Sequence, residues 1–153
     1  MIITFIGHSE ISNRDLVKNK VTEALREQID TDTRVVFYCG GYGDFDNICA
    51  EACSAIKKEK PLCEIIYVTP YIGPSYQQKL KAIEETRLYD AILYPPLETV
   101  PFRYAILKRN EWMVDEADLV IAYVIRERGG AYKSMRYAIR KNKHIFNLAK
   151  QKC

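Results

Sequence analysis

The sequence predicts an α/β fold, a Rossmann-like three-layer domain with a mostly parallel sheet of about five or six strands. Short apolar runs alternate along the chain with longer stretches whose apolar residues recur at helical spacing. Strands that alternate with helices form right-handed βαβ units, which give a parallel sheet. We find no linker, repeat or low-complexity stretch, and 153 residues with 48% hydrophobic content suit one core. We therefore expect residues 1–153 to form a single Rossmann-like domain.

Three strands and two helices are expected in the first half of the chain. The strands are short apolar runs that end at glycine or proline, and they cover Ile2–Ile6, Arg34–Cys39 and Ile65–Thr69. The helices, about residues 12–29 and Asp44 to about Lys58, each carry one apolar face. These faces consist of Val17, Val21, Ala24, Leu25 and Ile29 in the first helix and of Ile48, Ala52, Ala55 and Ile56 in the second.

The second half continues the same alternation. The clearest strand is Asp118–Ile125, whose continuous apolar run indicates a central position in the sheet. Pro101 suits the first turn of a helix that runs to about Glu116. The other expected elements are a short helix over Gln77–Thr86, a brief strand over Ala91–Tyr94, a helix from Gly129 through Asn142 and a last strand over His144–Leu148.

Three loops follow strands at the edge of the sheet where ligands of such folds bind. In open α/β sheets this edge is formed by the carboxyl ends of the strands. The loops cover residues 7–10, 40–46 and 126–134, and two of them carry paired glycines directly before a helix. Free backbone N–H groups and the helix dipole favour an anion there. Two such loops at one edge indicate a phosphate- or nucleotide-binding site.

The first glycine loop, Gly40-Gly41-Tyr42-Gly43, matches neither common phosphate-binding template. A dinucleotide fingerprint would need glycine where Asp46 stands, and no Walker-type Gly-Lys-Ser/Thr run is present. A structural turn and a ligand-binding loop therefore both remain open. Asp44 and Asp46 would repel a phosphate. They can instead favour the helix N-terminus, with Asp44 as its N-cap, or accept hydrogen bonds from ribose hydroxyls.

The second glycine loop has the opposite charge. Arg126, Arg128 and Lys133 flank Gly129-Gly130 and Ser134, so we expect the phosphate here and the sugar at the first loop. His8 can donate a hydrogen bond or act as general acid/base, or it can be a loop residue with no catalytic role. Arg109 can contact an anion or a surface carboxylate. Two loop tyrosines, Tyr42 and Tyr132, can stack on a base.

Composition narrows the expected partners. The net charge of +3 is not the dense basic field that nonspecific DNA binding needs, so nucleic acid is an unlikely partner. No apolar run approaches about 20 residues, and the first residues do not resemble a signal peptide, so we expect a cytoplasmic protein with no membrane contact. The five cysteines lack CxxC spacing and are expected to be reduced and buried. We expect no metal and no cofactor.

Taken together, the motifs resemble those of the SLOG superfamily, which includes DprA/Smf and the Lonely-guy proteins. The strongest resemblance is to the YpsA-like branch of uncharacterised bacterial proteins. It is carried by Gly7-His8, by Gly40 to Gly43 followed by Ala50-Glu51-Ala52, by Arg109-Asn110, by 113-MVDEADLVIAYV-124, and by Gly129-Gly130 with Tyr137-Ala138. The resemblance implies a Rossmann-like domain that binds nucleotides or nucleotide-derived ligands at the glycine loops, often as a dimer.

The sequence departs from these relatives at catalytic positions. Lonely-guy enzymes, which hydrolyse the N-glycosidic bond of nucleoside monophosphates, carry GGxGTxxE. Here Asp44 stands for the threonine and Asn47, which cannot ionise, for the catalytic glutamate. In the later GGT pattern Ala131 replaces threonine, and Ser9 stands where an arginine is common. These departures favour ligand binding over hydrolysis.

The expected function is a binding domain that senses or sequesters a nucleotide or nucleotide derivative, as a homo-oligomer such as a dimer. One alternative is an N-glycosidic-bond hydrolase resembling a nucleoside monophosphate phosphoribohydrolase, with Asp44, Asp46 and Glu51 as candidate catalytic acids. A second is a nucleic-acid-associated protein related to DprA. The expected ligand-binding residues are Gly7, His8, Ser9, Gly40, Gly41, Tyr42, Gly43, Asp44, Asp46, Arg109, Gly129, Gly130 and Ser134.

Overall fold

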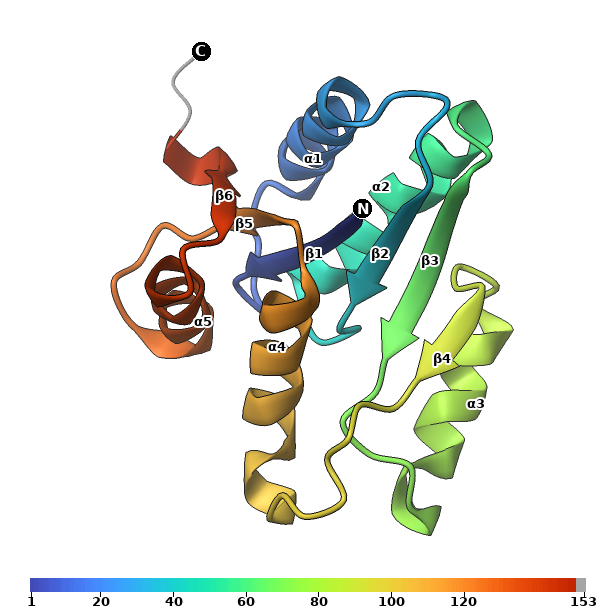
Figure 1. Ribbon diagram of the computed structural model, residues 1–153, viewed down its shortest axis with the longest axis vertical. Helices are drawn as coiled ribbons and strands as arrows, with labels where there is room; N and C mark the ends of the chain where they lie inside the picture. Colours follow the sequence, from blue (N-terminus) through green and yellow to red (C-terminus); the bar gives the residue numbers. More distant parts are fainter. Residues whose placement is uncertain (151–153) are drawn as a thin grey trace.

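The computed structural model, which describes residues 1–150, contains one parallel sheet of six strands (Figure 1). Its strand order is β4-β3-β2-β1-β5-β6, and every adjacent pair runs in parallel. The strands are β1 (Ile2–Gly7), β2 (Val35–Cys39), β3 (Cys63–Val68), β4 (Ala91–Leu93), β5 (Leu119–Tyr123) and β6 (His144–Asn147). The predicted fold class is confirmed.

Five α-helices connect the strands. They are α1 (Arg14–Gln28), α2 (Asp44–Glu59), α3 (Gln77–Glu85), α4 (Ala105–Glu116) and α5 (Gly129–Arg140). Three short 3₁₀ turns, η1 (Pro74–Tyr76), η2 (Phe102–Tyr104) and η3 (Leu148–Lys150), complete the described elements. The expected helix from Pro101 thus starts as a 3₁₀ turn, a common form at helix N-termini.

Helices cover both faces of the sheet and form the three layers. On one face, α1 and α2 bury Val21, Leu25, Ile48 and other apolar residues against β1, β2, β3 and β5. On the other face, α4 and α5 pack Val114, Met135 and their neighbours against β1 and β5. Because β1 and β5 are covered on both sides, their sequences are nearly continuous apolar runs. The sheet therefore holds the core, and the loops at its edges are left for function.

The order of the strands places the carboxyl ends of β1 and β5 at a topological switch point. From β1 the chain proceeds outward through β2, β3 and β4, then returns to β5 on the other side of β1. The loops after β1 and β5 consequently leave in opposite directions and open a crevice between them, where ligands of doubly wound folds bind.

The cysteines agree with the prediction from spacing as far as the structure describes them. Cys39, Cys49, Cys53 and Cys63 are buried and form no disulfide within residues 1–150. Burial raises the pKa of the Cys49 and Cys53 thiols, so they stay protonated. Cys153 lies outside the described residues. Among residues 1–150, no helix is long and apolar enough to cross a bilayer.

Candidate functional site

A cavity of about 540 Å³ lies at the carboxyl end of β1, between α4 and the loop that follows β5. We call it the switch-point pocket. It brings together most of the ligand-binding residues expected from the sequence, and Asn110, Met113, Arg126 and Arg128 also line it. The expected residues in its wall are Gly7, His8, Ser9, Tyr42, Asp46, Arg109, Gly129, Gly130 and Ser134. The structure places Gly40, Gly41, Gly43 and Asp44 outside the wall.

The first glycine loop is bound to the loop that follows β1. At the start of α2, the Asp44 N–H donates to the Ser9 carbonyl oxygen at 2.8 Å, and the Phe45 N–H donates to that of His8 at 3.3 Å. Two N–H groups that a phosphate would need are therefore occupied by the protein itself. The N-terminus of α2 does not offer an open anion site.

Local packing explains two glycines of this loop. Gly41 has φ of 62°, and a Cβ there would lie 2.4 Å from the Tyr67 ring. Gly43 has φ of 89°, and its Cβ would lie 2.7 Å from the Ser9 Cα. Residues with side chains rarely adopt such φ values. For Gly41 and Gly43, the structural-turn interpretation accounts for the sequence.

Two of the three candidate catalytic acids have structural partners away from the pocket. The Asp44 carboxylate accepts a hydrogen bond from the Ile11 N–H at 2.9 Å and so holds the two loops together. Gly43, not Asp44, occupies the N-cap position of α2, so the capping role expected for Asp44 is wrong. Glu51 lies further along α2 and pairs with Arg14 at 2.7 Å.

Asp46 is the third acid, and its carboxylate does line the switch-point pocket. One oxygen accepts a hydrogen bond from the Tyr42 N–H at 2.9 Å. Desolvation raises the pKa of Asp46 to about 6, because the Tyr42 N–H and the charge of Arg109 only partly stabilise the ionised form. Asp46 can therefore change its charge at the pocket wall near neutral pH, which moderates the repulsion that it would exert on a phosphate.

Arg109 projects from α4 into the interior and is only 2% exposed. Its Nη1 donates to the carbonyl oxygens of Gly40 at 3.0 Å and Val68 at 2.7 Å, and its Nε donates to Asn110 Oδ1 at 2.9 Å. Among residues 1–150, no carboxylate lies within ion-pair distance of Arg109, and its Nη2 has no hydrogen-bond partner. Arg109 therefore does not pair with a surface carboxylate, which was one of its two expected contacts. Its charge is buried at the pocket wall and forms no ion pair among residues 1–150.

His8 connects the loops that follow β1 and β5. It is buried, and its Nε2 accepts a hydrogen bond from the Ile125 N–H at 2.9 Å. Because that nitrogen accepts, neutral His8 carries its proton on Nδ1. Burial, and then the nearby charge of Arg126, lower the pKa of His8, so the neutral form is favoured. The geometry gives His8 a positioning role and leaves Nδ1–H as a donor.

The second glycine loop differs from the first in being open. Apart from the adjacent residues and the backbone of α5 itself, no heavy atom of residues 1–150 lies within 4 Å of the position of a Cβ at Gly129 or Gly130. Within residues 1–150, the N–H groups of Gly129, Gly130 and Ala131 have no hydrogen-bond partner, and no side chain caps α5. Exposed Arg126 and Arg128 stand beside them in the pocket wall. This helix N-terminus can therefore accept an anion without displacing any protein contact.

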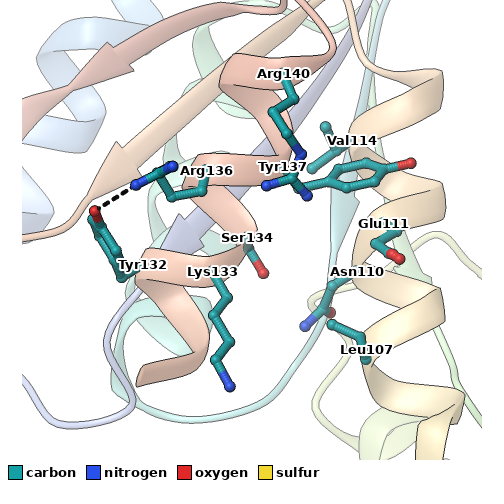
Figure 2. A pocket seen from close by; sticks show the side chains of 10 residues that line it. All are labelled: Leu107, Asn110, Glu111, Val114, Tyr132, Lys133, Ser134, Arg136, Tyr137 and Arg140. Carbon is teal, nitrogen blue, oxygen red and sulfur yellow. Dashed lines mark hydrogen bonds between the residues drawn. The ribbon is translucent and has the colours of Figure 1, made fainter. Parts of the chain in front are cut away.

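A second cavity, of about 420 Å³, lies between α4 and α5, and sequence reasoning missed it. We call it the α4–α5 groove. In Figure 2, Ser134 and Tyr137 of α5 point toward α4, and Asn110 of α4 points toward α5. Leu107, Asn110, Glu111 and Val114 come from α4, and Tyr132, Lys133, Ser134, Arg136, Tyr137 and Arg140 come from α5. Asn110, Val114 and Ser134 also line the switch-point pocket, so the two cavities are adjacent.

The sequence feature that could have indicated this groove is the distribution of charge along the chain, not the net charge. Residues 126–143 contain seven of the 23 Lys and Arg residues and one of the 20 Asp and Glu residues. The segment therefore has a net charge of +6, and the rest of the chain has −3. An overall charge of +3 conceals one strongly basic element.

Comparison with known proteins supports the fold. No family model and no curated protein matches the sequence. Two solved structures of DNA processing protein A (DprA) share the fold with a TM-score of 0.64. The Helicobacter pylori protein, whose structure describes a single-stranded DNA binding mode, is 21% identical, with 96% of this chain and 64% of that chain covered. The Streptococcus pneumoniae protein is 15% identical, with coverages of 95% and 49%. The present chain thus spans about half to two thirds of their length.

These findings correct one expectation. Nucleic acid was considered an unlikely partner because the net charge is modest, yet a solved protein of the same fold binds single-stranded DNA. The error is physical: net charge averages the basic segment with the acidic remainder of the chain. At these identities the comparisons establish the architecture alone. The chain has a DprA-like Rossmann-type fold, as the SLOG resemblance implied.

Proposed function

We propose that the chain binds a nucleotide through its phosphate in the switch-point pocket. The observation that carries this proposal is the buried charge of Arg109, which forms no ion pair among residues 1–150, in the wall of a pocket that also contains the open N-terminus of α5. Arg109 interacts electrostatically with Asp46 but has no carboxylate at ion-pair distance among residues 1–150, so a phosphate in the pocket would supply a close negative charge.

Each neighbouring group has a role in this arrangement. The N–H groups of Gly129 and Gly130 receive the phosphate at the positive end of the helix dipole. Arg126 and Arg128 add charge at the rim. Asp46, on the side of the first glycine loop, accepts from a ribose hydroxyl, and exposed Tyr42 offers a ring to the base. This agrees with the division between sugar and phosphate sides expected from the sequence.

The decisive test compares AMP with adenosine in thermal denaturation of the wild type and a Gly130→Asp variant. A ligand at 100 times its Kd stabilises the folded state by about 2.7 kcal/mol, so AMP should raise Tm and adenosine should not. Gly130 has open space around it, and a carboxylate in the first turn of α5 favours the helix by about 0.3–1 kcal/mol. The variant should therefore fold normally and lose the AMP response.

A matched control is Gly73→Asp, which adds the same charge at another glycine with no neighbour within 4 Å, outside the pocket wall. It should respond to AMP as the wild type does. Equal responses of the wild type and Gly130→Asp to AMP, or equal responses to AMP and adenosine, would overturn the phosphate assignment. Other nucleotides, dinucleotides and nucleotide sugars complete the panel, because the pocket does not itself define the base.

A second candidate function is the binding of single-stranded nucleic acid, favoured by the solved DprA structures of the same fold. The same pocket would then hold one nucleotide of a strand instead of a free nucleotide. Competition separates the two candidates. A labelled oligonucleotide that is displaced by AMP shares the pocket, whereas an AMP response without oligonucleotide binding favours a small-molecule ligand.

Hydrolysis of the N-glycosidic bond remains a narrower proposal that depends on Asp46. It is the one candidate acid in the pocket wall, and its pKa of about 6 suits a general acid or base near neutral pH. Free adenine released from AMP and detected by mass spectrometry, with the release abolished in Asp46→Asn, would support an enzyme. AMP that is bound and returned intact would exclude this activity on AMP.

Three sequence-based expectations stay predictions: assembly as a homodimer, cytoplasmic location and membership of the YpsA-like branch. Size-exclusion chromatography with light scattering tests the first directly.

A further inference from the structure

We infer that the α4–α5 groove binds the phosphodiester backbone of a single nucleic-acid strand that enters the switch-point pocket. The inference rests on the proposed phosphate site and deepens it by assigning a polymeric ligand and its path. The two cavities share Asn110, Val114 and Ser134, so a ligand can continue from one into the other along α5.

Charge is the first argument for this occupant. Lys133, Arg136 and Arg140 line the groove, and none of them pairs with a carboxylate among residues 1–150. All three are exposed. A row of cations without counter-charges is suited to a row of phosphates.

The carboxylates near the groove already have partners. Glu111, which lines it, pairs with Lys108 at 3.3 Å. Asp115 accepts a hydrogen bond from the Tyr137 hydroxyl at 2.7 Å and lies 3.9 Å from the Lys141 ammonium. These contacts reduce the repulsion that a polyanion would meet, so the basic side of α5 dominates the groove.

Spacing along α5 distinguishes a strand from a mononucleotide. Lys133 and Arg140 are seven residues apart, which is about 10 Å along a helix axis. Figure 2 shows their side chains at opposite ends of the groove. The two cations thus lie along an extended path, which suits a strand that carries several phosphates.

Aromatic rings are interleaved with these cations. Tyr132 and Tyr137 line the groove, and the Arg136 guanidinium donates to the Tyr132 hydroxyl at 3.0 Å (Figure 2). The pKa of Tyr137 is raised to about 12, by burial first and then by Asp115, so its ring stays neutral. Cationic grooves with aromatic rings are typical of proteins that bind single strands with little sequence preference.

The test measures fluorescence anisotropy of labelled oligo(dT), about 20 nucleotides long, with the full chain. An Arg136→Gln/Arg140→Gln double variant should weaken oligo(dT) binding about 10-fold or more. It should also reduce the slope of log K against log salt by about 1.4, since each lost single-strand phosphate contact contributes about 0.7. Its Tm response to AMP should equal that of the wild type, because neither residue lines the switch-point pocket.

The matched control is Lys79→Gln/Lys81→Gln on α3, which removes two exposed lysines and the same net charge. It should retain the wild-type affinity and salt slope. Equal losses in both double variants would show a nonspecific effect of net charge and overturn the inference, as would unchanged binding in the groove variant.

Failure of the inference can be distinguished from failure of the proposed function. A wild-type protein that binds AMP but not oligo(dT) would overturn the strand path and leave the phosphate site in place. Oligo(dT) binding that persists in Gly130→Asp but is lost in the groove variant would instead overturn the phosphate site while retaining a groove for the strand. Binding of neither ligand would overturn both.

Discussion

The two glycine loops resemble each other in sequence and differ in what surrounds them. At Gly40 to Asp46, the N-terminus of α2 donates its hydrogen bonds to the loop after β1, and neighbours closely enclose Gly41 and Gly43. At 126–134, the first N–H groups of α5 have no partner within residues 1–150, and Gly129 and Gly130 have open space around them. A glycine pair before a helix therefore indicates a tight turn in one loop and an accessible anion site in the other.

Charge strengthens the contrast. Asp44 and Asp46 accompany the occupied loop, whereas Arg126 and Arg128 accompany the open one. The acids of the first loop thus accept hydrogen bonds within the protein, and Asp46 also lines the proposed sugar side of the pocket. The arginines of the second loop form no ion pair among residues 1–150 and remain available to a ligand.

The largest expected effect is on folding. Gly43→Ala should lower the free energy of unfolding by about 2–4 kcal/mol, because its φ of 89° strains a side-chain residue and its Cβ would lie 2.7 Å from the Ser9 Cα. Gly130→Ala should be neutral or stabilise by up to about 1 kcal/mol, since it adds a better helix former in open space. Urea denaturation of both variants measures the difference. Equal stability of the two would remove the distinction between a packed loop and an open one.

A smaller effect is expected from Asp46. The pKa of its folded state, about 6, exceeds the ordinary value of 3.8, so the folded state holds a proton that the unfolded state releases. Stability should consequently fall as pH rises from 3.8 to about 6, by about 1–3 kcal/mol after allowance for the partial exposure of the residue.

Asp46→Asn keeps an oxygen that can accept from the Tyr42 N–H but cannot ionise. Its stability relative to the wild type should therefore increase across the same pH range, measured by urea denaturation at about pH 4 and about pH 7. Parallel stability profiles for the two proteins would contradict the assigned burial of this carboxylate. The variant should also bind oligo(dT) more tightly at neutral pH, because a negative charge in the pocket wall is removed.

The sequence predicted much of the fold because apolar periodicity is a local signal. The continuous run in β5 and the apolar face of α1 identify a central strand and a covering helix without knowledge of their partners. The carboxyl-end rule then placed His8, Asp46 and Gly130 at one pocket. Strand order, which creates the switch point between β1 and β5, depends on pairing between distant segments.

What the sequence left open was decided by contacts between such segments. The hydrogen bonds of Asp44 to Ile11 and Ser9 span more than thirty residues, and no local pattern distinguishes them from a capping interaction. The burial of Arg109 depends on carbonyl groups of Gly40 and Val68. The α4–α5 groove requires two helices to be placed side by side, although the basic character of α5 was readable in the sequence.

The most direct test of the contrast between the loops is a ¹H–¹⁵N NMR titration with AMP that follows the glycine amides. Binding at the open loop should shift the amide signals of Gly129 and Gly130 most strongly. Those of Gly41 and Gly43 should shift less, because these two glycines lie outside the pocket wall, which only Tyr42 and Asp46 of their loop reach. The largest shifts at Gly41 and Gly43, with Gly129 and Gly130 unmoved, would place the phosphate at the first loop and contradict this account.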